Sequence, residues 1–266
     1  MTMLKPIADG AIVAKRNLIK IKRVPDILVF STISPIMFIL LFAYVFGSAI
    51  EVQGTNYREF LIPGIFAQTV IFGATLTGAG MADDIKKGII DRFRSLPMSR
   101  SAVLIGRTGS DLANNVLIIT VMSLTGLLIG WRIRSSVGEA IGGFLLLLAF
   151  AYAISWIMAW VGLLVPSPEV VNNASFVVIF PLTFIANTFV PTNNFPAPLK
   201  FVANWNPVSS VTQAARDLFG NTPATVPKPD YWSLQHPVLY TVGWIVLLLL
   251  IFVPLSVRQY KKAASR

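Results

Sequence analysis

The sequence predicts an all-α integral membrane protein, built as a single domain around six transmembrane helices. Its 266 residues are 55% hydrophobic and 13% charged, with a mean hydropathy of +0.69, whereas about 25% of the residues of soluble domains are charged. Six apolar runs contain no Asp, Glu, Lys or Arg, and each is long enough to cross a bilayer, which takes roughly 20 residues. These runs cover residues 28–50, 60–80, 112–130, 140–165, 171–190 and 237–257. Because a backbone in lipid must satisfy its own hydrogen bonds, such runs predict helices rather than the shorter strands of a membrane barrel.

The distribution of basic residues predicts the orientation in the membrane. A net charge of +10 is also typical of nucleic-acid-binding proteins, but here the basic residues follow the membrane topology. Six of them precede the first run, five lie within residues 83–100 and four follow the last run, whereas six lie on the opposite side. Basic loops stay in the cytoplasm. We therefore expect both termini and the 83–100 segment to be cytoplasmic, and we expect no nucleic-acid partner.

Residues 1–27 are predicted to form a cytoplasmic interfacial helix that lies flat on the inner leaflet. Its apolar side chains recur with a period of about 3.5 residues, and Pro25 ends the helix before the first span. The apolar positions are Ile7, Ala11, Ala14, Leu18 and Ile21. A basic leader that only sets the topology is the alternative. A cleaved signal peptide is not expected, because the charged leader is too long and the first apolar run has the length of a span.

The segment 83–100, between the second and third spans, holds five basic and three acidic residues. A helical interpretation gives it an apolar face and a charged face, and Pro97 ends the helix. The apolar face holds Ile85, Ile89, Phe93 and Leu96, and the charged face holds Asp84, Lys87, Asp91 and Arg94. The pattern fits either a helix at the lipid headgroups or a docking helix whose mixed charges bind a protein partner.

The longest predicted loop, residues 191–236, lies on the opposite side of the membrane. Asn206 is a candidate N-cap, Pro207 takes the first helical position, and Gly220 is a candidate stop signal. The segment between them is amphipathic, which predicts a short helix at the outer leaflet before span 6.

Nothing in the sequence indicates catalysis or metal binding by this chain alone. The phosphate-binding pattern GxxxxGK[ST] is missing, so an ATP-driven process would need ATP and Mg²⁺ on a partner subunit. There is no cysteine, the single histidine is His236, and no cluster of His, Asp and Glu has the spacing of a metal site. The span cores lack the carboxylates and histidines of a proton relay, which disfavours a proton-coupled carrier. Arg107 and Asp111, four residues apart, are predicted to pair at the cytoplasmic end of the third span.

Polar and aromatic side chains within the spans are candidates for a substrate path. A few polar groups among aromatic rings suit large hydrophobic or amphiphilic ligands. The candidates are Tyr44, Phe46, Phe66, Asn114, Asn115, Asn172, Asn173, Phe180, Phe184 and Asn187. For the polar ones, hydrogen bonding between helices is the alternative role.

Three segments follow a pattern known from one family of transporters. They are SPIMFILLFAYVFG (residues 34–47), DIKKGIIDRFRSLPMSRSAVLIGR (84–107) and NWNPVSSVTQAARDLFGN (204–221). These segments and their order along the chain resemble the permease subunit of type-2 ATP-binding-cassette exporters, in the daunorubicin-resistance branch. The resemblance covers nearly the whole chain. The Leu-Pro turn followed by Ser99 and Arg100, together with NPVS…ARDLFG, is the most specific part of the resemblance.

The resemblance implies a role for the 83–100 helix. In that family, the helix after the second span is a coupling helix, which sits in a cleft of a separate ATP-hydrolysing subunit. The matching residues are Asp84, Lys87, Gly88, Asp91, Arg92, Arg94, Ser95, Leu96, Pro97, Met98, Ser99 and Arg100. The short helices before span 6 would dip into the outer half of the membrane and help to close the exit.

The resemblance also implies an assembly and a function. Two ATP-binding subunits, which carry the ATP and Mg²⁺, would join this chain and a second permease, identical or homologous, in the membrane lipid. The expected function is export of a hydrophobic drug or lipid-like substrate. A polysaccharide or glycolipid exporter of the same fold is an alternative. Two alternatives from other classes are a proton-coupled carrier and a membrane assembly protein that transports nothing.

Overall fold

The computed structural model describes residues 4–23, 25–47, 50, 52, 54–94, 101–223 and 229–263. Within these residues all regular secondary structure is helical, with no β-strand, which confirms the predicted fold class. The first half of the chain forms α1 (Leu4–Arg23), α2 (Pro25–Leu41), the π-helical turn η1 (Phe42–Phe46), α3 (Tyr57–Gly73), α4 (Thr75–Lys86), α5 (Ile89–Arg94) and α6 (Ala102–Leu128). The second half forms α7 (Val137–Gly162), α8 (Pro168–Ile185), the short 3-10 helix η2 (Thr192–Asn194), α9 (Ala197–Trp205), α10 (Pro207–Leu218), α11 (Trp232–Gln235) and α12 (Pro237–Ala263).

Five helical stretches of the described chain are long and apolar enough to cross a membrane. They are Tyr57–Lys86 (α3 with α4), Ala102–Leu128 (α6), Val137–Gly162 (α7), Pro168–Ile185 (α8) and Pro237–Lys262 (α12). The first predicted span corresponds to α2 and η1, which include a shorter apolar helix over Thr32–Phe46. The 17 residues of α2 and the five of η1 rise about 33 Å at about 1.5 Å per residue, enough to cross the hydrocarbon core.

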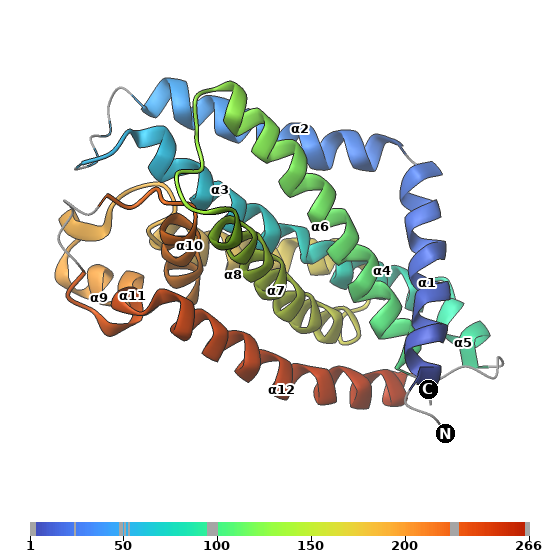
Figure 1. The fold of residues 1–266 in the computed structure, drawn as a ribbon. Helices are drawn as coiled ribbons and strands as arrows, with labels where there is room; N and C mark the ends of the chain where they lie inside the picture. The colour runs from blue at the N-terminus through green and yellow to red at the C-terminus, as the bar shows by residue number, and fades with distance from the viewer. Residues whose placement is uncertain are drawn as a thin grey trace.

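The connections between the long helices gather at two ends of the bundle (Figure 1). The short helix α5 lies at one end, where α1 begins and α12 finishes, and α9, α10 and α11 lie at the other. We call the first the inner end and the second the outer end, after the sides predicted from the sequence. The described parts of the chain thus begin and finish at the same end, as an even number of spans requires.

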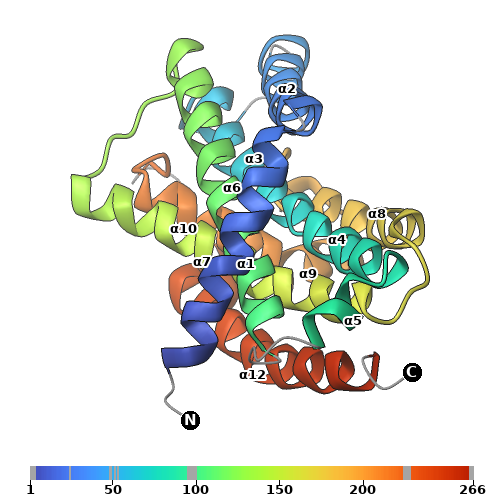
Figure 2. The same cartoon turned by 90° about the vertical axis from the view of Figure 1, so that its right-hand side faces the viewer.

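Helix α1 runs across the inner end of the bundle and passes over α6 (Figure 2). Its buried stripe is Gly10, Val13 and Asn17, whereas Ala11, on the predicted apolar face, is exposed. A Cβ on Gly106 of α6 would lie 2.5 Å from the carbonyl oxygen of Gly10, so the two backbones cross at a distance that glycine permits. One side of α1 is therefore fixed to the protein, a contact that a 3.5-residue apolar period did not reveal.

Local signals set the ends of several helices. Asn56 caps α3 by accepting a hydrogen bond from the backbone N–H of Arg58 at 3.0 Å. Ser136 and Glu139 form a capping box at the start of α7. Gly130 follows α6 with a φ of +101°, a conformation that favours glycine, and turns the chain at the outer end.

The buried apolar residues form two clusters. The larger one includes an aromatic group between α3, α7 and α10, in which neighbouring ring centroids lie 4.8–6.3 Å apart. Its rings belong to Phe66, Trp131, Phe144 and Phe219. The smaller cluster joins the inner ends of α4, α5, α6, α7 and α12. The bundle therefore has one extensive apolar core and a second, smaller one at its inner end.

Candidate functional site

The segment predicted as one coupling helix is divided at Gly88. Helix α4 ends at Lys86, and Gly88 has a φ of +63°, a conformation that strains any residue with a side chain. A separate helix of six residues, α5, begins at Ile89. The break changes the register, so Ile90, only 4% exposed, anchors α5 in the smaller apolar cluster. The predicted continuous helix is therefore wrong over the described part of this segment, because glycine allowed the chain to turn.

The residues matched to a coupling helix have different surroundings. Asp84 is buried and lies 3.4 Å from Arg16 of α1, so its carboxylate faces the protein itself. Lys87 is exposed and donates to Asp83 at 2.8 Å, a hydrogen bond that raises the pKa of the lysine. Arg92 is exposed on α5. Asp91 and Arg94 contribute their backbone to α5, and Ser95, Leu96, Pro97, Met98, Ser99 and Arg100 lie outside the described residues.

Polar side chains tie α1, α4 and α6 together at the inner end. Asn17 of α1 donates to the hydroxyl of Ser110 of α6 at 3.3 Å. Arg107 of α6 donates to the backbone carbonyl of Leu76 of α4 at 2.8 Å. Arg107 also lies 3.8 Å from Asp111, which confirms the predicted pair.

The Arg107–Asp111 pair is fitted closely against α4. The buried carboxylate of Asp111 accepts a hydrogen bond from Thr77. A Cβ on Gly80 would overlap the guanidinium of Arg107, so the missing side chain admits this arginine between the two helices. Asp111 and Asp84 are thus both paired within the protein, where an unpaired charge would be costly.

An apolar groove of about 290 Å³ lies between α2, α3 and α8. It is lined by Ser34, Pro35, Phe38, Ile65, Gln68, Thr69, Phe72, Phe176 and Phe180. Six of these nine residues are apolar and four of the six are phenylalanines, with three uncharged polar side chains among them. Sites for hydrophobic ligands have this composition, in which a few polar groups fix the orientation of the ligand.

Two rows of stacked phenylalanines run from the groove toward the outer end. The rows are Phe176, Phe180 and Phe184 along α8 and Phe38, Phe42 and Phe46 along α2 and η1, with neighbouring centroids 4.1–5.9 Å apart. Phe189, beyond the end of α8, joins the rows, with its ring centroid 4.5 Å from Phe42 and 4.8 Å from Phe184. These phenylalanine rows make a continuous aromatic surface across two helices.

The structure brings Phe46, Phe180 and Phe184 of the predicted substrate path to the phenylalanine rows. Four of the other predicted residues are buried: Phe66 lies in the aromatic group of the larger cluster, Asn114 and Asn115 lie on α6, and Asn187 lies beyond the end of α8. The remaining three are exposed: Asn172 and Asn173 lie near the start of α8, and Tyr44 lies on η1. Of the nine groove residues, only Phe180 was among the predicted path residues, and Gln68 and Thr69 are polar groove residues that were not predicted. The four-residue spacing of phenylalanines over 38–46 and 176–184 was the available signal for the rows.

Asn187 belongs to a non-helical segment, because α8 ends at Ile185 and not at the predicted residue 190. The backbone N–H of Asn187 donates to the hydroxyl of Ser209 at 3.1 Å, and its carbonyl accepts from Arg216 at 2.7 Å. Ser209 and Arg216 both lie on α10, which starts after Asn206 as predicted. Eight of the twelve residues of α10 are buried, so this helix is an interior element and does not float at the interface.

Arg216, one of the basic residues predicted for an outer loop, is buried within the protein. Its side chain is 2% exposed. Its Nε donates to the carbonyl of Phe60 at 2.8 Å, and its Nη2 donates to the carbonyls of Asn187 and Thr188 at 2.7 and 3.2 Å. The guanidinium carbon lies 3.5 Å from the centre of the Phe60 ring. No signal in the sequence distinguishes this arginine from a water-facing one.

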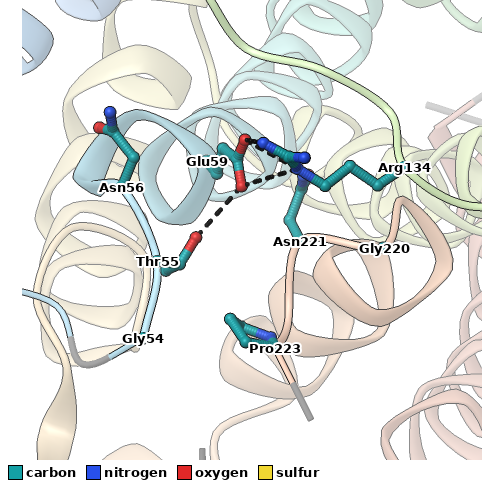
Figure 3. Close-up of a pocket in the computed structure, with 8 residues that line it drawn as sticks. All are labelled: Gly54, Thr55, Asn56, Glu59, Arg134, Gly220, Asn221 and Pro223. Carbon is teal, nitrogen blue, oxygen red and sulfur yellow. Dashed lines mark hydrogen bonds and ion pairs between the residues drawn. The ribbon is translucent and has the colours of Figure 1, made fainter. Parts of the chain in front are cut away.

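A polar pocket of about 350 Å³ opens at the outer end (Figure 3). It is lined by Gly54, Thr55, Asn56, Glu59, Arg134, Gly220, Asn221 and Pro223. Arg134 donates to both carboxylate oxygens of Glu59 at 2.6–3.2 Å, and these bonds raise the pKa of the arginine. The pair joins the start of α3 to the connection between α6 and α7, so the pocket lies where outer connections are tied together.

Comparison with known proteins agrees with this architecture. Residues 10–219, which reach from α1 to the end of α10, match the family model described as ABC-2 type transporter. The chain is 31% identical over 246 residues to a daunorubicin resistance ABC transporter permease protein of Streptomyces coeruleorubidus, which covers 92% of this chain and 83% of that protein. It is 24% identical over 233 residues to a protein of Mycobacterium tuberculosis named as a doxorubicin resistance ABC transporter permease, which covers 87% and 80% of the two chains. The chain therefore belongs to the ABC-2 type transporter family, as a membrane-integral permease that is not catalytic by itself.

Proposed function

We propose that this chain is the membrane-spanning subunit of an ATP-driven exporter for hydrophobic or amphiphilic molecules of drug or lipid type. The observation that carries the proposal is the groove between α2, α3 and α8, where phenylalanine rings surround a few uncharged polar groups. Aromatic rings offer a large apolar contact area, and the polar groups would orient the ligand. The relatives named for daunorubicin and doxorubicin resistance support the same class of substrate.

A second permease, identical or homologous, completes the path in this proposal. The groove, at about 290 Å³, is at the lower limit of drug-sized sites, which span about 300–1,000 Å³. The neighbouring surfaces of α2 and α8 expose large apolar side chains, including Met37, Leu41, Phe176 and Val177. If a second copy covered these surfaces, a bulky ligand would lie between the two permeases with most of its area buried.

The inner end is the proposed contact with a separate ATP-binding subunit, two copies per exporter, which hold the ATP and Mg²⁺. Helix α5 lies at this end, and Lys87 and Arg92 are exposed there. The excess of basic residues at the same end supports a cytoplasmic location for this end and both termini, in the cell membrane of a bacterium. ATP use by the partner would shift the permease between two arrangements that differ in their affinity for the ligand.

The pairing of buried carboxylates argues against a proton-coupled carrier. Glu59, Asp84 and Asp111 are the buried acidic residues of the described chain, and basic partners lie 2.6, 3.4 and 3.8 Å from them. A proton relay uses acidic residues along the transport path, whereas each of these three is engaged with a basic side chain of the protein. An external energy source fits this arrangement better.

Reconstitution with the native ATP-binding subunit in proteoliposomes tests the proposal, with daunorubicin as the probe. We expect ATP-dependent transport, and we expect Phe180→Ala to raise the KM about fivefold, since ring contacts worth about 1 kcal/mol correspond to that factor. The control is Phe201→Ala on α9, because Phe201 is 57% exposed and lies outside the groove. Transport that needs a proton gradient but no ATP, or equal KM values for the two variants, would contradict the proposal.

A further inference from the structure

We propose that Arg216 is a positioning residue that holds the segment 187–189 and thereby seats the ring of Phe189 at the outer end of the phenylalanine rows. The inference rests on the proposed function in one respect, namely that the rows border the substrate path. In this arrangement Phe189 seals the rows toward the outer end, and Arg216 keeps the seal closed without touching the substrate.

The first support is the set of hydrogen bonds between α10 and the segment 187–189. Nη2 of Arg216 donates to the carbonyls of both Asn187 and Thr188, and the hydroxyl of Ser209 accepts from the N–H of Asn187. These three bonds take up backbone groups that no helix satisfies, because α8 has already ended. The segment therefore depends on α10 for its conformation.

The second support is the contact of the same segment with α3. The hydroxyl of Tyr57 donates to the carbonyl of Phe189 at 3.1 Å. A Cβ on Gly64 would overlap the carbonyl of Thr188, so the segment lies directly against the α3 backbone. Nε of Arg216 donates to the carbonyl of Phe60, which ties the arginine to α3 as well. The segment is thus clamped between two helices, and one guanidinium bonds to both sides.

The choice of arginine is informative. Its planar guanidinium presents five donors in a fixed fork, so one side chain can reach carbonyls in different directions, which a lysine ammonium at the end of a flexible stem does less well. Burying such a group is costly, and Nη1 has no hydrogen-bond partner among the described atoms. A charged group kept inside a membrane protein at this cost marks a functional position.

The clamp controls the position of one ring. Phe189 stacks on Phe42 of η1 and packs at a tilt against Phe184 of α8, so it bridges the two rows. Displacing the backbone at 187–188 would withdraw this ring and separate the outer ends of the rows. The rows would then open toward the outer side.

The test measures leakage through the complete complex. Proteoliposomes that hold the permease with its ATP-binding subunit are loaded with a small fluorescent dye, and its escape is followed without ATP. We expect Phe189→Ala and Arg216→Met to leak severalfold faster than wild type, and Arg216→Lys to leak almost as fast as Arg216→Met. The matched control is Arg132→Gln, which changes an exposed arginine at the same end whose side chain donates, among the described residues, only to the carbonyls of Leu127 and Trp131, and it should leave leakage at the wild-type level.

The outcomes separate the inference from the proposed function. Wild-type leakage in Phe189→Ala would overturn the seal, and wild-type leakage in Arg216→Lys would overturn the requirement for a forked donor. A purely structural role would lower the yield of folded Arg216→Met without raising leakage per folded complex, which also counts against the inference. Since the dye measurement requires neither ATP nor a chosen substrate, a wild-type complex that fails to export daunorubicin would contradict only the proposed function.

Discussion

The two ends of the bundle hold arginine side chains in different ways. At the outer end, Arg216 is 2% exposed, and each of its hydrogen bonds goes to a backbone carbonyl. At the inner end, Arg16 and Arg107 face the carboxylates of Asp84 and Asp111, although Arg107 also donates to one carbonyl, that of Leu76. The side chain of Arg16 is 39% exposed. The fold fixes where a carbonyl lies, whereas an ion pair between side chains tolerates small displacements. The difference indicates a rigid closure at the outer end and an adjustable joint at the inner end.

The largest effect is expected from Gly64→Ala at the outer end. Its Cβ would overlap the carbonyl of Thr188, which the clamp prevents from moving away. We expect a loss of about 3 kcal/mol in the free energy of unfolding, the upper range for overpacked sites. Gly109→Ala on α6 is the control, because nothing lies within 4 Å of its added Cβ. Thermal unfolding in detergent measures the stability of both variants. Equal melting temperatures would show that the segment 187–189 can move to make room for the added methyl group.

The next effect concerns the pair Arg16 and Asp84. Arg16→Asp should lower the free energy of unfolding by about 2 kcal/mol, because the buried carboxylate of Asp84 loses its partner and meets a like charge. The double exchange, Arg16→Asp with Asp84→Arg, should recover most of this loss, because an ion pair works in either order. No second substitution of this kind can rescue Arg216→Asp, since carbonyls cannot be exchanged. Failure of the double exchange to recover stability would remove the distinction between the two ends.

Gly80→Ala at the inner end should cost less than Gly64→Ala, at about 1 kcal/mol. The added Cβ would overlap the far end of the flexible Arg107 side chain rather than a backbone atom. The arginine can move aside, although its bond to the carbonyl of Leu76 would weaken. Melting temperatures of the two alanine variants, measured side by side, give the comparison directly. A larger loss of stability for Gly80→Ala than for Gly64→Ala would contradict the expected order.

The smallest effect on stability is expected from Lys87→Ala. Lys87 is exposed and its pair with Asp83 lies at the surface, where such pairs add little. We expect an unchanged melting temperature but weaker co-purification of the ATP-binding subunit, because the lysine is a proposed contact. Lys261→Ala, an exposed lysine on α12 at the same end, is the control. Unchanged co-purification of the Lys87 variant would remove this residue from the proposed contact.

The sequence predicted the features that depend on neighbouring residues. The spans were found because apolar length is a local property, and α10 was found because Asn206 and Pro207 mark a helix start wherever they occur. The Arg107–Asp111 pair was found because helix geometry alone brings the two side chains together. These features needed no knowledge of which helix packs against which.

The features that were missed depend on contacts distant in sequence. A basic residue in an outer segment looks the same whether water or carbonyls satisfy it, so the burial of Arg216 could not be predicted. The buried stripe of α1 depends on Gly106, ninety-six residues after Gly10. The break at Gly88 was misjudged because a helix tolerates an isolated glycine, and the outcome depends on how Ile90 packs. The proposed contacts of residues 95–100 stay predictions.

The crossing of α4 and α7 determines how force could travel through the molecule. A Cβ on Gly162 would overlap the carbonyl of Gly78, so the two backbones touch at this point. Helix α12 is attached to α7 by the bond from the hydroxyl of Ser256 to the carbonyl of Trp156 at 3.0 Å. Backbones in such close contact resist sliding, so a push on α4 would carry α7 and α12 in the same direction. The groove lies outside this set of helices, between α2, α3 and α8, so its width would depend on how far α2, α3 and α8 follow the movement.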